Sequence, residues 1–220
     1  MSQVCAIALR AERGAPWQRQ RMAQAVAGVG LAGDLHADPL SPRQVLLAGA
    51  GAYSRHALQP GALGENLLID LDTSAIASGT LLAIGPQAVL SVSFQCEACG
   101  YLDAQSPGLA KRIGTQRGVL ARVLRGGTIT ERDAVRLLPG SGQQWHEDWR
   151  ERVRVVLRRM PPDMVLEYAQ LARLAGVQAS YCRVMPRIVR EAGLEGKAIA
   201  KGAQPEALRW DGGGLFEDQP

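Results

Sequence analysis

Residues 91–102 read Ser-Val-Ser-Phe-Gln-Cys-Glu-Ala-Cys-Gly-Tyr-Leu, a short β-type run that delivers two cysteines into a turn. Gly100 loosens that turn. The thiolate is the reactive and metal-binding form of cysteine, and a nearby Arg or His favours it. We therefore take Cys99 as the candidate working sulfur.

The residues around this stretch alternate between apolar runs and glycine turns. Such closely spaced strands, broken at Gly85-Pro86 and Gly126-Gly127, predict a mainly β fold with a sheet closed into a barrel. Residues 10–24 are polar and Arg-rich and are predicted as a loop, and short helices are expected at 53–58 and 106–113. The predicted strands are 4–9, 44–48, 67–69, 80–84, 88–94, 118–124, 128–129 and 134–138.

The composition is that of an ordinary globular protein, with 46% hydrophobic and 21% charged residues in 220. No apolar run reaches the length of about 18 residues that a membrane span needs, and the first ten residues do not resemble a signal peptide. The four cysteines are therefore expected to be thiols in a cytoplasmic protein.

The Cys96-x-x-Cys99 pair is open to several interpretations. Structural zinc needs four ligands, usually from two such pairs, and only one is present. A thioredoxin-like site needs a helix after the motif, and Gly100-Tyr-Leu is not predicted to form one. A buried, inert cysteine, a sulfur nucleophile and a thiolate ligand for a soft metal remain.

Three other segments carry candidate polar groups. The glycines at 28, 30 and 33 precede Asp34 and His36 and predict a tight turn that exposes backbone N–H groups, or a plain surface turn. Arg43 lies just before a predicted strand. Its side chain is either solvated or donates two parallel hydrogen bonds to a phosphate or carboxylate. Gly64-Glu65-Asn66 precedes another strand, and its side chains could simply bond the turn backbone.

The ordered set of motifs resembles a MOSC domain, the module named for the C-terminal domain of molybdenum-cofactor sulfurases, over roughly residues 1–140. One departure is Arg132-Asp133, where the family usually has Gly-Asp. The motifs are Gly-Leu-Ala-Gly-Asp-Leu-His (30–36), Arg-Gln-Val (43–45), Pro-Gly-Ala-Leu-Gly-Glu-Asn-Leu (60–67), Gly-Thr-Leu-Leu-Ala-Ile-Gly (79–85), Cys-Glu-Ala-Cys (96–99) and Arg-Val-Leu-Arg-Gly-Gly-Thr-Ile (122–129).

The resemblance implies a β-barrel that handles the molybdenum cofactor (molybdopterin) or its sulfur. It implies that Cys99 ligates molybdenum or carries persulfide, with Cys96 as a helper. The pocket would be completed by catalytic-site residues Asp34 and His36 and by cofactor-binding residues Arg43, Gln44, Gly64, Glu65 and Asn66. The Arg side chain and the turn N–H groups suit the pterin phosphate.

Stand-alone family members of the reducing type convert N-hydroxylated bases and amidoximes to amines, with electrons from a partner protein. The resemblance therefore implies an oxidoreductase acting on a small N-hydroxylated substrate. The alternative is a sulfur or cofactor carrier served by a sulfurase. The chain has no recognisable pyridoxal-phosphate domain, because none of its three lysines lies in such a motif.

Residues 145–201 form a second predicted domain, small and all-α. They hold eleven Arg or Lys against seven Asp or Glu, and helices are expected at 145–160, at 165–175 and from about Ser180. Two helices joined by a short Gly turn predict a helix-turn-helix, and a helical cap or dimerisation module is the alternative. Residues 202–220, acidic and Gly-rich, are expected to be a flexible, solvated tail.

Residues 156–176 resemble the DNA-binding part of alkylguanine-DNA alkyltransferases and alkyltransferase-like proteins. The Pro-Cys-His-Arg nucleophile motif of that family is absent, so alkyl transfer is not expected. Pro186 would kink or delay the recognition helix. The resemblance implies DNA contacts from Tyr168, Arg183 and Arg187, and a third hypothesis is a DNA-binding protein whose barrel is a degenerate sensor.

Overall fold

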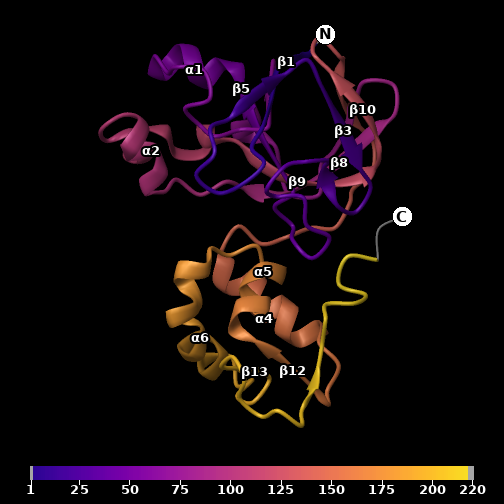
Figure 1. Cartoon of the computed structure of the whole chain (residues 1–220), viewed down its shortest axis with the longest axis vertical. Helices are drawn as coiled ribbons and strands as arrows, with labels where there is room; N and C mark the ends of the chain where they lie inside the picture. Colours follow the sequence, from indigo (N-terminus) through magenta and orange to yellow (C-terminus); the bar gives the residue numbers. More distant parts are fainter. Residues whose placement is uncertain (1, 218–220) are drawn as a thin grey trace. The chain divides into compact units, whose positions relative to one another are not determined.

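The computed structural model describes residues 2–217, except the side chains of Ala179 and Ser180. The chain divides into two compact units. The first comprises the residues up to 39 together with 43–144, and the second comprises residues 40–42 together with those from 145 on. Figure 1 shows that the first is rich in strands and that the second carries most of the longer helices.

The first unit is built on an eight-stranded sheet with the order β11-β7-β8-β9-β5-β6-β1-β2, so the mainly β prediction is confirmed. A smaller sheet has the order β10-β3-β4. The strands are β1 (Val4–Leu9), β2 (Gln18–Gln20), β3 (Met22–Val26), β4 (Gly30–Leu31), β5 (Val45–Gly49), β6 (Leu67–Ile69), β7 (Leu81–Ile84), β8 (Ala88–Gln95), β9 (Val119–Arg125), β10 (Gly127–Thr130) and β11 (Val135–Leu138).

The predicted closed barrel is corrected by this topology, because the large sheet is open as a ladder of strands. Within residues 2–217, one isolated antiparallel bridge, between Gln3 and Ala134, joins the two sides of this sheet. Next to it, the amide of Val4 donates to Asp133 O at 2.9 Å and that of Val135 donates to Ser2 O at 2.8 Å. The sheet therefore curls round without a continuous seam.

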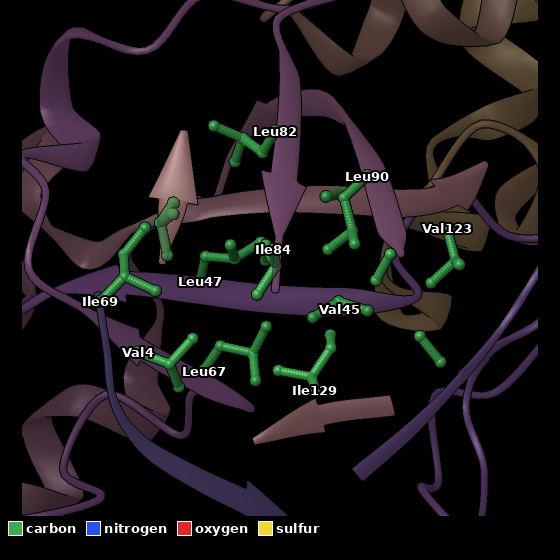
Figure 2. Packing of buried hydrophobic residues seen from close by; sticks show 14 of the residues in the cluster. Val4, Val45, Leu47, Leu67, Ile69, Leu82, Ile84, Leu90, Val123 and Ile129 are labelled. Carbon is green, nitrogen blue, oxygen red and sulfur yellow. The ribbon is translucent and has the colours of Figure 1, made fainter. Parts of the chain in front are cut away.

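Strand β5 is buried along its whole length because both of its faces are covered. Val45 and Leu47 point into the main core, which Figure 2 shows from close by with Val4, Leu82 and Ile84. Ala48 instead belongs to a smaller cluster with residues of the helical segments. This two-sided burial explains why the strand reads as a continuous apolar run instead of an alternating one.

Short helices and 3₁₀ turns cover the outer face of this part of the sheet. The prediction that no helix follows the cysteine pair was wrong: α2 begins at Gly100, with Cys99 at its N-cap position. Leu102 packs into the smaller cluster, and this contact holds a turn that local sequence does not favour. The helical segments are α1 (Ala50–His56), η1 (Thr73–Ala75), α2 (Gly100–Gln105), α3 (Leu109–Ile113) and η2 (Gly114–Arg117).

The second unit is not all-α, as the sequence predicted, but contains a parallel three-stranded sheet with the order β13-β12-β14. The expected helix at 165–175 is split, with its first residues in β12, because Leu166 and Val165 find pairing partners far along the chain. The elements are α4 (Trp149–Arg159), β12 (Met164–Glu167), α5 (Tyr168–Leu174), η3 (Ala179–Arg183), α6 (Met185–Glu191), β13 (Ala198–Ile199) and β14 (Leu208–Arg209).

Residues 208–215, which the sequence places in a solvated tail, are packed. Strand β14 pairs with β12, and the side chains of Trp210 and Leu215 are buried. These apolar residues are scattered among glycines and acids, so composition alone conceals them. Residues 218–220 of that predicted tail lie outside the described residues.

Pro186 delays the third helix instead of kinking it. It lies in the first turn of α6, where the missing N–H costs nothing because the first amides of a helix have no intrahelical partner. Among the described residues, no helix is long and apolar enough to cross a membrane.

Gly118 allows β9 to approach β5 closely, and we expect Gly118→Ala to destabilise the first unit by about 3 kcal/mol or more. Its φ is +116°, and an added Cβ would overlap the Leu47 carbonyl. Gly28→Ala is the control: its φ is +71° with no atom within 4 Å of the added Cβ, so only backbone strain of about 1–2 kcal/mol is expected. Urea unfolding measures both variants, and an equal loss of unfolding free energy in the two would contradict the close approach at Gly118.

Candidate functional site

Asp34 is the centre of a buried hydrogen-bond network and is only 6% exposed. Its Oδ1 accepts from the backbone N–H of His36 at 2.9 Å and lies 3.0 Å from His36 Nδ1. Its Oδ2 accepts from Arg10 N at 3.0 Å and from Asn66 Nδ2 at 2.9 Å. Burial alone would raise the pKa of Asp34, but the hydrogen bonds from His36 and Arg10 outweigh it and hold the pKa below its ordinary value.

Asn66 extends this network across the sheet. Its Oδ1 accepts from Leu46 N at 3.0 Å, and its Nδ2 also reaches Ala8 O at 3.3 Å. The side chain thus joins β1, β5 and the Asp34 turn. The structure brings Asp34, His36 and Asn66 together, as the sequence predicted, and gives Asp34 and Asn66 protein partners on both of their polar ends.

Glu65 bonds a different partner from its neighbour Asn66. It is 6% exposed, and its Oε1 accepts from the Tyr53 hydroxyl at 2.5 Å. Its Oε2 is buried with no hydrogen-bond partner within the described part of the chain. Burial raises the pKa of Glu65. The hydrogen bond from Tyr53 and the nearby charge of Arg117 act in the opposite direction but do not outweigh burial. A free, buried carboxyl oxygen is available for a ligand or a proton.

The two cysteines are brought together by Arg117, at the end of η2. Cys96 is 3% exposed and accepts from Arg117 Nε at 2.9 Å, whereas Cys99 is half-buried at the start of α2. Burial alone would lower the pKa of Arg117, but the negative potential of Cys96, Cys99 and Tyr101 raises it. The guanidinium therefore supplies positive charge next to the two sulfurs.

Gly64 brings the carboxyl and sulfur parts of the site into one cluster. A Cβ at this residue would lie 3.3 Å from Tyr101 and 3.4 Å from Trp17. The Arg117 guanidinium lies 6.0 Å from the Tyr101 ring centroid, and that of Arg10 lies 4.8 Å from the Trp17 ring. We call this set the Gly64 cluster: Arg10, Trp17, Gly64, Glu65, Tyr101 and Arg117.

Gln44 is placed elsewhere, among backbone groups. Its Nε2 donates to Gly28 O at 2.6 Å and to Asp38 O at 2.9 Å, and its Oε1 accepts from Val123 N at 3.0 Å. This amide holds the glycine turn against β9. Arg43 is half-buried at the entry to β5. Burial lowers the pKa of Arg122, a basic residue of the same region, to about 10.

Sequence reasoning missed Arg117, Tyr53, Trp17 and Tyr101. Arg117 stands 21 residues after its partner Cys96, and only the antiparallel pairing of Gln95 with Val119 brings the two together. Trp17 lies in a segment that was predicted as a loop and that includes β2. The one available signal was Tyr101, two residues after Cys99 in the quoted motif.

The predicted DNA-binding residues lie on the second unit. Tyr168 begins α5 and is half-buried, and Arg183 is exposed at the end of η3. Arg187 is exposed on α6 and forms an ion pair with Glu191, Nε to Oε1 at 2.7 Å. DNA binding stays a prediction, and the strand at 164–167 departs from a helix-turn-helix at its first helix.

The MOSC domain model matches residues 42–136. The matched segment includes Gln44, Glu65, Asn66 and both cysteines of the site, while Asp34 and His36 precede it. A comparison with curated proteins found no match.

Solved structures share the fold. The YuaD protein from Bacillus subtilis is 16% identical with a TM-score of 0.53, over 61% of this chain and 94% of that one. A hypothetical protein is 21% identical with a TM-score of 0.54, over 88% and 92%. YiiM from Geobacillus stearothermophilus is 16% identical with a TM-score of 0.51, over 86% and 100%. The two larger coverages extend beyond the first unit into the second.

We expect Asp34→Asn to reduce the free energy of unfolding by about 1–3 kcal/mol at pH 7, because an amide donor would face the N–H groups that the carboxylate accepts from. The pKa of Asp34 is lowered on folding, so its contribution is present above the unfolded pKa and is lost as the pH falls through the lower folded value. The difference in unfolding free energy between the wild type and the variant should therefore become smaller below about pH 4. Denaturant titrations at several pH values measure this difference, and the exposed Asp163→Asn is the control. A difference that becomes larger at low pH would contradict the role assigned to Asp34.

The two sulfurs should differ in access. Iodoacetamide should modify Cys99 at least about tenfold faster than Cys96 in the folded protein, because a buried thiol cannot be reached. Peptide mass spectrometry at short times measures both rates in one sample. In denaturant the rates should converge, and faster labelling of Cys96 in the native chain would refute the assignment.

Proposed function

We propose that the chain is a MOSC-domain protein that binds the molybdenum cofactor and reduces N-hydroxylated small substrates, with Cys99 as the metal ligand. The observation that carries the proposal is the half-buried Cys99 thiol beside the buried Arg117. The match of residues 42–136 to the MOSC domain model supports it independently.

The residues present fit such a group. Among the described residues, no set of three or more His, Cys, Asp or Glu side chains is arranged to hold a metal ion, and the site offers one accessible thiol. A cofactor that brings the other metal ligands itself suits this arrangement. The unpartnered Glu65 Oε2 and Arg117 Nη1 offer it, or its substrate, further polar contacts.

Each residue has a defined task in this proposal. The cofactor, when bound, supplies the two-electron redox chemistry that cleaves an N–O bond. Cys99 ligates the metal, and the Arg117 guanidinium supplies positive charge beside the sulfur. The reduction consumes two protons and releases water, and Glu65 Oε2 can hold one of these protons because burial raises the pKa of its carboxyl.

The remaining residues support the site. Asp34 and Asn66 fix the loops that carry His36 and Glu65. Arg43 keeps the proposed role of donor to the pterin phosphate, whereas the amide of Gln44 is engaged by backbone groups and positions the glycine turn. An electron-donor protein is required as a partner.

A sulfur carrier is the second candidate, and the contact between Cys96 and Arg117 at 2.9 Å favours it. A guanidinium beside a sulfur pair stabilises a persulfide anion as well as a thiolate. In this function a sulfurase would load Cys99, and no turnover of substrate would follow.

We expect near-stoichiometric molybdenum in protein purified from a host that makes the cofactor, and none from a host that does not. Cys99→Ser should lose the metal and the reduction of an amidoxime with an artificial electron donor, because the thiolate ligand is removed. Cys182→Ser, in the second unit, is the matched control and should retain both.

Elemental analysis and mass spectrometry of the Cys99 peptide separate the two candidates. A persulfide on Cys99 without molybdenum would support the carrier and exclude the reductase. Absence of both from the fully folded protein would exclude both functions.

A further inference from the structure

Four buried polar atoms around Gly64 have no hydrogen-bond partner within the described part of the chain. They are Arg10 Nε, Trp17 Nε1, Glu65 Oε2 and Arg117 Nη1. Buried polar groups in folded proteins are almost always paired, and each unpaired one costs about 1–3 kcal/mol. Such atoms in one place indicate that a ligand completes them.

Each of the four side chains is linked to Gly64, either directly or through an aromatic ring beside it. Trp17 and Tyr101 both lie against Gly64, which precedes Glu65. The Arg10 guanidinium covers the Trp17 ring at 4.8 Å, and that of Arg117 lies 6.0 Å from the Tyr101 ring. Glu65 and Arg117 are only 6% and 7% exposed. The ionisable groups at this place are therefore buried and do not lie on the surface.

The chemistry of these atoms defines the ligand. Three are N–H donors, two of them on guanidinium cations, and one is a carboxyl oxygen that accepts when it is ionised. A cation would be repelled by the two arginines, and an apolar group would leave all four atoms unpaired. An oxyanion that also carries a hydroxyl group satisfies three donors and one acceptor at once.

We propose that the Gly64 cluster is a binding site for the inorganic phosphate ion in its monohydrogen form. Arg10, Trp17 and Arg117 donate to its oxygens, and Glu65 accepts the hydrogen of its hydroxyl. Glu65 therefore makes the site selective for phosphate over sulfate, which has no proton to donate at neutral pH. Phosphate binding needs neither molybdenum nor Cys99, so it can be measured whether or not the chain is an enzyme. Glu65 and Arg117 belong to both proposals, so phosphate should compete with the cofactor or its substrate at these two residues.

Calorimetric titration at pH 8 of the full chain, purified from a host without the molybdenum cofactor, tests the proposal. Inorganic phosphate should bind at one site. Trp17→Phe, which keeps the ring but removes its N–H, and Arg117→Lys should each weaken binding by about tenfold or more, the effect of losing one hydrogen bond to a charged group. Arg19→Gln is the control: this exposed arginine pairs with Glu131 and should leave binding unchanged.

Glu65→Gln gives the sharpest readout. The amide can still accept from Tyr53 while presenting a donor to the ligand, so the variant should bind sulfate about as well as phosphate, whereas the wild type prefers phosphate. A melting curve verifies that each variant is folded. Methyl phosphate, which has no hydroxyl proton at pH 8, should bind the wild type more weakly than phosphate, and equal or tighter binding would contradict the role given to Glu65. Absence of phosphate binding, or binding that the folded Trp17→Phe and Arg117→Lys variants retain in full, would overturn the proposal.

Discussion

The hydrogen bond from Asn66 Nδ2 to Asp34 Oδ2, at 2.9 Å, is the contact on which the arrangement of the site depends. A buried carboxylate is tolerated only when its oxygens are paired, and Asp34 obtains its partners from a turn, from the end of β1 and from Asn66. The same amide accepts from Leu46 in β5. One side chain pair therefore fixes the distance between three segments, and Gly64, Glu65 and Arg10 take their positions from it.

A second constraint comes from the pairing of β8 with β9. The register places Gln95 opposite Val119, so the residues just beyond each strand, Cys96 and Arg117, meet at the sheet margin. The Cys96-x-x-Cys99 motif does not point to Arg117, and the contact of Cys96 with Arg117 follows from strand length and register. The position of the contact between Cys96 and Arg117 is thus set by the sheet. The helices α2 and η2 lie just beyond the strand ends that determine it.

The strands between residues 44 and 138 could be predicted from sequence because apolar runs there are separated by Gly and Pro. The strands β2 and β3 could not: β2 consists of polar, largely exposed residues, and the two buried residues of β3, Ala23 and Ala25, are too small to give a clear apolar pattern. The open seam of the sheet was also hidden, because pairing of strand ends leaves no trace in composition. In the second unit, Val165 and Leu166 satisfy a helical pattern locally, and only their distant parallel partners turn them into a strand.

The candidate site was predictable where motif and chemistry coincide, at Asp34, His36, Glu65, Asn66 and the two cysteines. Its cationic half was not: Arg117, which contacts Cys96, was not among the predicted residues, and Arg43 was predicted for phosphate or carboxylate. Gln44, which the resemblance implies as a cofactor-binding residue, has a side chain that bonds three backbone groups in the structure.

The bridge between Gln3 and Ala134 joins the segment before β11, at one end of the strand order, to the segment that leads into β1, near the other end. Three backbone hydrogen bonds accompany it, from Val4 N to Asp133 O, from Arg132 N to Val4 O and from Val135 N to Ser2 O. Val4 and Val135 belong to the main core, so loss of these bonds would bring water to apolar side chains. Residues 2–4 therefore hold the two sides of the curled sheet together, although no continuous ladder runs between them.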